Sequence, residues 1–150
     1  MRAVLQRVSH AQVAIAGRVA GAIDRGLLVL LGIAGGDTPA DAEWLVQKIV
    51  RLRIFADDAG QMNRSVQDIA GGLLVVSQFT LLASTRKGTR PSFNDAARPE
   101  LAQPLYEQFL ALASTALGRP VAAGEFGADM QVCLANDGPV TLVLDSRQRE

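Results

Sequence analysis

The chain has 150 residues, of which 49% are hydrophobic and 20% charged, as is usual for a globular protein and unlike a disordered, fibrous or membrane protein. Fifteen acidic residues balance fifteen basic ones, so the net charge cannot hold a long stretch of nucleic acid, and any contact with RNA must be local. We expect a single domain over residues 1–150.

The chain contains one cysteine, Cys133, and one histidine, His10. These are too few for an intramolecular disulfide or for a zinc site with three or four protein ligands. No stretch is apolar and long enough for a signal peptide or a membrane span. We therefore expect a cytoplasmic protein that uses no metal and no cofactor.

Alternating hydrophobic residues between positions 2 and 23 predict short strands joined by tight turns, with Gly17 and Gly21 as turn residues. The continuous apolar run at residues 27–33 predicts a strand that is covered on both faces. Thr38 and Pro39 then suit the N-cap and the first position of a helix, and hydrophobic residues follow at helical spacing. We expect this helix over residues 39–52.

Asp57, Asp58 and Gly60 predict one turn and residues 71–72 another, with an irregular stretch between them. The run LLVVSQFTLL at residues 73–82 predicts a buried strand. Polar side chains interrupt this strand, and buried polar groups need hydrogen-bonding partners. From the pattern alone, these side chains are expected to cap neighbouring backbone groups.

Four basic residues, Arg86, Lys87, Arg90 and Arg98, lie in or close to a predicted loop that also contains glycine and proline. With Phe93 nearby, this loop could bind phosphates and stack a base, since arginine and aromatic residues have those roles in RNA recognition. A loop that is only solvated is an equal alternative.

A second helix is predicted over residues 99–117, with a late start or a bend at Pro104. Two strands are predicted at residues 130–135 and 140–145, around a turn at residues 136–139. Strands interrupted by two helices predict one α/β domain with mixed sheets and with the helices packed to one side.

Few residues offer chemistry on pattern alone. His10 falls in the alternating N-terminal strands, and we expect it to be a surface or partly buried strand residue. Cys133 also falls in a strand and is expected to be a small buried residue. The glycines of LGIAGGD lack the spacing of a phosphate-binding loop, so a plain turn is expected there.

Several motifs nevertheless occur together in one order. They are SQFTLL at residues 77–82, KGTRPSF at residues 87–93, and FGADM with NDGPVTLVLD between residues 126 and 145. The segments MRAVLQRVSHAQV, GLLVLLGI, LRIF and MNRSV extend the match to essentially the whole chain. In these motifs the sequence strongly resembles the D-aminoacyl-tRNA deacylase family.

The resemblance implies a three-layer α/β/β fold, a homodimer, and hydrolysis of the ester bond between a D-amino acid and tRNA. It implies that Ser77, Gln78 and Phe79 line the pocket for the aminoacylated 3′-terminal adenosine, and that Phe126 and Met130 lie near that adenosine. It implies no partnership with DNA or with a membrane.

The resemblance also implies that Gly138-Pro139 has a cis peptide bond, reaches into the active site of the other subunit and rejects L-aminoacyl-tRNA, while Arg7 orients it. A rejection based on the L side chain would leave glycine on tRNA as an accepted substrate. Ser77, Gln78 and Thr80 are the expected catalytic set. Thr80 matches a threonine once proposed as nucleophile, but no histidine or lysine lies beside it in sequence to activate it. We therefore favour assistance by the 2′-hydroxyl of the tRNA.

The sequence departs from the family at Ser84, where aspartate is expected, and at Pro104. Both departures leave the motifs intact. Two other functions stay open as alternatives. One is a non-catalytic module that binds RNA ends, and the other is a small-molecule esterase with Thr80 as nucleophile.

Overall fold

A long antiparallel ribbon begins the fold. In the computed structural model, which describes residues 1–149, β1 (Arg2–Ile15) and β2 (Arg18–Ile23) pair across a two-residue turn. Ala16 and Gly17 both have positive φ in this turn, as a tight hairpin requires. The predicted strands and the Gly17 turn are confirmed, but Gly21 lies inside β2 and not in a turn. A Cβ atom at Gly21 would lie 2.7 Å from the Ala123 carbonyl oxygen, so glycine is needed there for close packing.

The ribbon belongs to a mixed six-stranded sheet with the order β2-β1-β3-β6-β7, in which β8 also pairs with β1. The other strands are β3 (Gly26–Gly32), β6 (Gly72–Ser77), β7 (Ala122–Ala123) and β8 (Gln131–Asp145). The β3–β6 and β6–β7 pairs are parallel, and the pairs made by β1 are antiparallel. The predicted central strand at residues 27–33 is confirmed to within one residue as β3.

Two helices, α1 (Pro39–Arg51) and α2 (Pro99–Leu117), follow the predicted ranges closely. Helix α1 begins as expected at Thr38, whose backbone N–H donates to the Asp41 carboxylate at 2.8 Å. Helix α2 begins at Pro99 and continues through Pro104, so of the two outcomes expected there, a late start or a bend, the late start is wrong. Pro104 is exposed, and the burial of the opposite face of α2 outweighs the one backbone hydrogen bond that proline removes.

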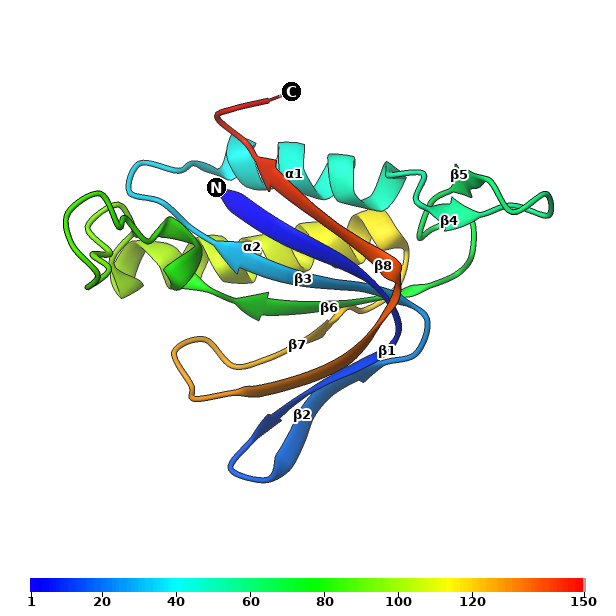
Figure 1. Ribbon diagram of the computed structural model, residues 1–150, viewed down its shortest axis with the longest axis horizontal. Helices are drawn as coiled ribbons and strands as arrows, with labels where there is room; N and C mark the ends of the chain where they lie inside the picture. Colours follow the sequence, from blue (N-terminus) through cyan, green and yellow to red (C-terminus); the bar gives the residue numbers. More distant parts are fainter. Residues whose placement is uncertain (150) are drawn as a thin grey trace.

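The elements form three layers, as expected (Figure 1). The helices cover one face of the sheet, and a large hydrophobic core that includes Leu45, Ile49 and Phe109 lies between them. In the middle of their length β1 and β8 bend away from the helices, and their distal halves form a second β layer with β2 (Figure 1). A smaller core that includes Val13 and Leu74 fills the space between the two β layers.

The predicted strand at residues 73–82 is only partly confirmed. Strand β6 ends at Ser77, and a short 3₁₀ helix, η1 (Phe79–Leu82), follows. The neighbouring strand β3 ends at the same level, where Leu31 pairs with Ser77 and accepts a hydrogen bond from the Gln78 N–H at 2.8 Å. With no strand left to pair with, the chain coils, and the Leu81 N–H bonds to the Gln78 carbonyl at 3.2 Å.

The two C-terminal strands predicted around a turn are in fact one strand, β8, whose two halves both pair with β1 in the same direction. Between Asn136, which pairs with Val8, and Thr141, which pairs with Gln6, β8 has more residues than β1 and bulges outward. The residues that predicted a reversal form this bulge instead. It carries the cis peptide bond of Gly138-Pro139.

The stretch predicted to be irregular, between the turns at residues 57–60 and 71–72, also contains regular structure. A small hairpin joins β4 (Phe55–Ala56) to β5 (Met62–Arg64), and the predicted turn at Gly60 lies between them. Among residues 1–149 no helix has the length and hydropathy needed to cross a membrane.

Candidate active site

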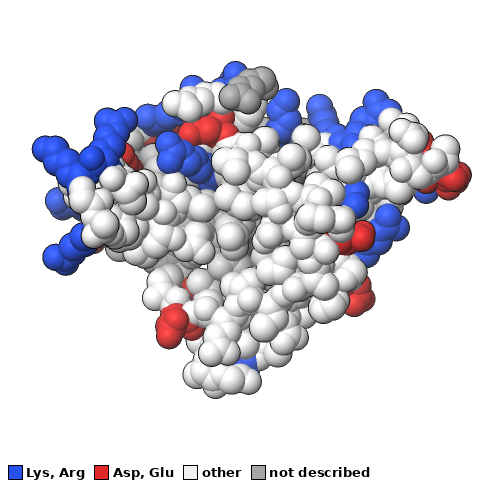
Figure 2. Space-filling model, viewed as in Figure 1, with Lys and Arg blue, Asp and Glu red and all other residues white. Residues whose placement is uncertain are grey.

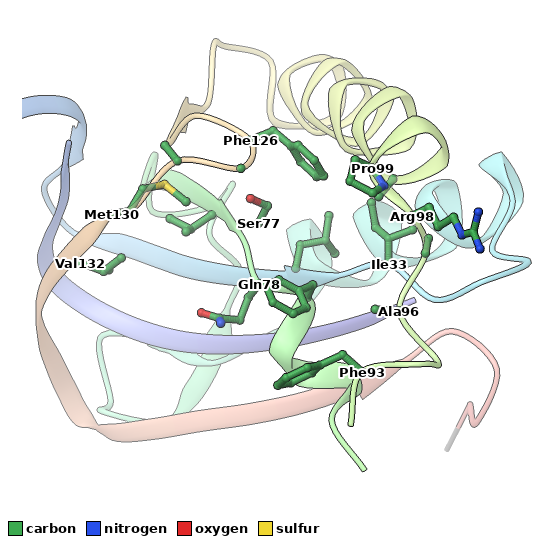
Figure 3. A pocket seen from close by; sticks show the side chains of 17 residues that line it. Ile33, Ser77, Gln78, Phe93, Ala96, Arg98, Pro99, Phe126, Met130 and Val132 are labelled. Atoms are coloured by element: carbon green, nitrogen blue, oxygen red, sulfur yellow. The ribbon is translucent and has the colours of Figure 1, made fainter. Parts of the chain in front are cut away.

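A cavity of about 590 Å³ lies where β6 ends, between η1, the start of α2 and the segment from Phe126 to Val132. Its wall is mainly apolar, with side chains from Ile33, Met130 and Val132 (Figure 3). This size falls within the range of pockets for small molecules, and a few polar groups on an apolar wall are typical of sites that orient a ligand.

Ser77 and Gln78 provide polar groups in this wall. Ser77 is the last residue of β6, and Gln78 begins the turn into η1, so the end of the strand brings both to the cavity. Figure 3 shows the Ser77 side chain between β6 and Phe126. The Gln78 amide group donates a hydrogen bond to the Thr80 hydroxyl, which links η1 to the cavity wall.

Aromatic rings form two sides of the cavity. Phe79, whose side chain is 57% exposed, meets Phe93 edge-to-face with 5.1 Å between the ring centroids. Phe126 packs against Tyr106, with 5.8 Å between the ring centroids. Tyr106 donates a hydrogen bond to the Val75 carbonyl at 3.0 Å, and burial raises the pKa of Tyr106 to about 12. Tyr106 therefore stays neutral and supports Phe126 from behind.

Thr80 lies beside the cavity but does not line it. It is exposed on η1, and the hydrogen bond from Gln78 is the contact that its hydroxyl makes. Among the described residues that line the cavity, Arg98 is the one titratable residue. The structure thus brings Ser77 and Gln78 into the wall and Thr80 next to it, but no side chain with a pKa near neutrality joins them.

Gly138 and Pro139 lie away from the cavity of their own chain and do not line it. Both residues belong to the β8 bulge, which Arg7 contacts. The Arg7 Nε donates a hydrogen bond to the Asp137 carbonyl at 2.7 Å, and its Nη1 donates one to the Ile54 carbonyl at 2.6 Å. A Cβ atom at Gly138 would lie 3.2 Å from Arg7 Nη2. Arg7 thus contacts the Gly-Pro segment, and the segment projects outward with Pro139 exposed.

His10 and Cys133 lie outside the cavity wall. His10 is an exposed residue of β1, as expected, and its Nδ1 lies 3.2 Å from the Ser9 hydroxyl. Cys133 lies in β8 as predicted but is exposed, so the expected burial is wrong, because its side chain points away from the sheet's core face. Within residues 1–149 no three histidine, cysteine or acidic side chains lie close enough to hold a metal ion.

The sequence did not predict that Phe93 and Arg98 line the cavity. The loop after η1 folds back so that Ser84 and Ser92 exchange backbone hydrogen bonds of 2.8 and 2.9 Å. The Ala97 N–H then bonds to the Ile33 carbonyl at 2.9 Å. The unusual Ser84 takes part through its backbone, and the basic and aromatic composition of the loop was the available signal.

Comparison with known proteins shows the family of the chain. A family model described as "D-Tyr-tRNA(Tyr) deacylase" matches residues 4–145. The chain belongs to this deacylase family. It is similar to proteins named "D-aminoacyl-tRNA deacylase" from Opitutus terrae, at 72% identity over 100% of both chains, and from Roseiflexus castenholzii, at 63% identity over 97% of this chain and 92% of the relative. The resemblance read from the motifs is confirmed.

Solved structures share the fold. One, described as "c-Myc DNA Unwinding Element Binding Protein", superposes with a TM-score of 0.92 at 44% identity, over 97% of this chain and 98% of the other. Another, described as a probable eukaryotic D-amino acid tRNA deacylase, gives a TM-score of 0.85 at 17% identity, over 95% and 97% of the two chains. At that identity the second likeness concerns the fold alone. The deacylase family's α/β/β architecture is thus present here.

Proposed function

We propose that this member of the deacylase family hydrolyses the ester bond between a D-amino acid and the 3′-terminal adenosine of tRNA. Water adds to the ester carbonyl, the bond to the ribose oxygen breaks, that oxygen takes a proton, and the D-amino acid and free tRNA separate. The relatives named D-aminoacyl-tRNA deacylase, which cover the whole chain, support this substrate class. We further propose that the chain works as a homodimer in the cytoplasm.

One observation carries the proposed mechanism: a cavity of about 590 Å³ in which, among residues 1–149, Arg98 is the one titratable lining residue. A hydrolase that activates a side-chain nucleophile needs a base next to it. Since the cavity wall offers none, the assisting group comes from the substrate, whose 2′-hydroxyl is adjacent to the ester. Holding that group in place is worth about 7–11 kcal/mol of the barrier when the geometry is good.

The cavity residues then bind and orient the substrate. Ser77 and Gln78 hydrogen-bond the ester and the ribose, a role that their position in the cavity wall supports. Phe79, Phe126 and Met130 supply apolar surface for the adenine ring. Thr80 fixes the Gln78 amide through their hydrogen bond. In this role Thr80 positions Gln78 and does not attack the ester.

Discrimination between D and L is assigned to Gly138 and Pro139 of a second subunit. They lie off their own cavity, project outward, and are held by Arg7, which supports a role in a neighbouring molecule's site. A rigid segment placed against the α-carbon would exclude an L side chain and leave a D side chain free. Glycine has no side chain to exclude, so glycyl-tRNA is a further expected substrate.

The test is hydrolysis of matched D- and L-aminoacyl-tRNA with the same side chain by the purified chain, with and without a chelator. Rapid cleavage of the D form alone, unchanged by chelator, is expected. Equal cleavage of both forms would indicate a general esterase. Cleavage of neither would indicate a module that only binds RNA ends.

A further inference from the structure

Four cations beside the cavity stand apart from the other basic residues of the chain. Within residues 1–149, Arg86, Lys87, Arg90 and Arg98 form no ion pair and no side-chain hydrogen bond. Every other lysine and arginine of the described chain except Arg51 contacts an acid, an amide or carbonyl oxygen, or an aromatic ring. Those residues are Arg2, Arg7, Arg18, Arg25, Lys48, Arg53, Arg64, Arg119, Arg147 and Arg149. We call the four unpaired residues the mouth cations.

The mouth cations belong to the segment that forms one wall of the cavity. Phe93, Ala96 and Arg98 of this segment line the cavity directly. Backbone hydrogen bonds hold it there, from the Gly35 N–H to the Asp95 carbonyl and from the Ala97 N–H to the Ile33 carbonyl, both at 2.9 Å. Figure 3 shows the Arg98 guanidinium pointing away from Ser77 and Phe126, out of the cavity. The charge of Arg98 is therefore at the mouth and not over the reacting ester, and the other three cations lie in the loop between Ser84 and Ser92 that leads into this segment.

Two acidic residues flank the opposite wall of the cavity, and one of them is neutralised, because Glu125 pairs with Arg18 at 2.7 Å. Glu125 and Asp129 are exposed on either side of Phe126, in the segment that lies across from the mouth cations. Figure 2 shows blue side chains along the left edge, where Figure 1 draws the loop after η1, and red ones below them. Since the whole chain has a net charge of zero, the mouth cations, which have no partner among the described residues, form a local positive patch that attracts an anion.

We propose that the mouth cations bind the backbone phosphates of the acceptor end of tRNA, next to the adenosine that enters the cavity. This inference rests on the proposed function. Guanidinium groups without a partner in the protein are free to bind phosphate with two parallel hydrogen bonds. The substrate carries a chain of phosphates that starts beside the terminal adenosine, so phosphates reach the mouth whenever the ester is in the cavity.

The experiment compares two substrates of the whole protein, D-aminoacyl-tRNA and a D-aminoacyl-adenosine that has no phosphate. In the triple variant Arg86→Gln, Lys87→Gln, Arg90→Gln, we expect KM for the tRNA to rise about 10- to 100-fold with kcat unchanged. Hydrolysis of the adenosine ester should stay as in the wild type, which also shows that the variant folds.

Salt dependence gives a second readout. Each lost phosphate contact should make the slope of log KM against log salt shallower by about 0.7 to 0.9, so the triple variant should lose about 2 to 3 units of slope. The double variant Arg86→Lys, Arg90→Lys keeps the charge, so its salt slope should stay close to that of the wild type even though the two parallel hydrogen bonds of each guanidinium are lost. Arg51→Gln is the matched control. Arg51 is also exposed and has no partner among the described residues, but it is the last residue of α1 and does not line the cavity.

The outcomes separate the two proposals. An unchanged KM for tRNA in the triple variant, or an equal loss on both substrates, would overturn the phosphate assignment while the deacylase activity of the wild type stands. A wild-type chain that cleaves neither substrate would overturn the proposed function and, with it, this inference.

Discussion

At the scale of single residues, the role of Thr80 is the most direct question. Its hydroxyl accepts a hydrogen bond from Gln78, and it lies outside the cavity wall. We expect Thr80→Ala to retain D-aminoacyl-tRNA hydrolysis within about 10-fold, since it loses one hydrogen bond of about 1 kcal/mol. Single-turnover rates are the measurement, and Thr80→Ser is the control. A loss of about 10⁴-fold or more with tRNA binding intact would identify Thr80 as the nucleophile.

Gly138 is the residue for which substitution is most restricted. Its φ of +149° is unfavourable for residues with a side chain, and an added Cβ would lie 2.8 Å from the Val140 side chain. We expect Gly138→Val to reduce D-aminoacyl-tRNA hydrolysis by about 100-fold or more by displacing the Gly-Pro segment. Gly60→Val is a matched control, because Gly60 also has positive φ but no atom near its Cβ position. Wild-type turnover by Gly138→Val would contradict the role of this segment.

At the scale of elements, the capping of α1 by Asp41 makes the stability of the protein depend on pH. Burial raises the pKa of Asp41, but hydrogen bonds from Ser146 and Thr38 lower it more, to about 2. Because the folded pKa lies below the unfolded value of 3.8, the stabilisation is complete above that value and is lost as pH falls through about 2.

We therefore expect Asp41→Ala to lower the free energy of unfolding by about 1–2 kcal/mol at pH 7, and the difference from wild type to narrow between pH 4 and pH 2. Urea unfolding at several pH values measures this. Glu43→Ala, which removes an exposed acid from the same helix, should change stability by less than about 0.5 kcal/mol. A pH-independent difference for Asp41→Ala would show that the carboxylate charge is not involved.

The elements also show what could be predicted from the sequence. Both helices were predicted closely, because their caps and apolar spacing are local signals. The end of β6 at Ser77 was missed, because it depends on where β3 ends and not on the apolar run itself. For the same reason the sequence predicts a reversal of the chain where β8 only bulges, since the partner strand β1 is distant in sequence. Tertiary pairing decided both cases.

The site was predicted in part. The cavity contains Ser77, Gln78, Phe79, Phe126 and Met130, all expected there from the family motifs. Thr80, Arg7 and the Gly-Pro segment lie outside the cavity wall of their own chain. Arg98 was not expected to line the cavity, because a loop must fold back on Ile33 before its residues reach that place.

At the scale of the whole molecule, the separation of the Gly-Pro segment from its own cavity predicts a shared active site. Light scattering should give about twice the 15.9 kDa mass of the chain. If two subunits complete each site, co-expressing Gly138→Val with Gln78→Ala should restore activity, because each mixed dimer contains one site with neither substitution. About a quarter of the wild-type activity is expected from random pairing. Activity no higher than that of the two parents would place both motifs in one subunit's site.

The pairing of β1 with β8 has a consequence for how the chain is made. Arg2 and Asp145, which bond across these strands, are 143 residues apart. A ribosome adds about 5–20 residues per second, so β1 emerges roughly 7–30 s before its last neighbour in the sheet exists. During that interval one edge of β1 is open to strands of other nascent chains. Strand β8, which is synthesised last, pairs with this edge and so protects it from aggregation.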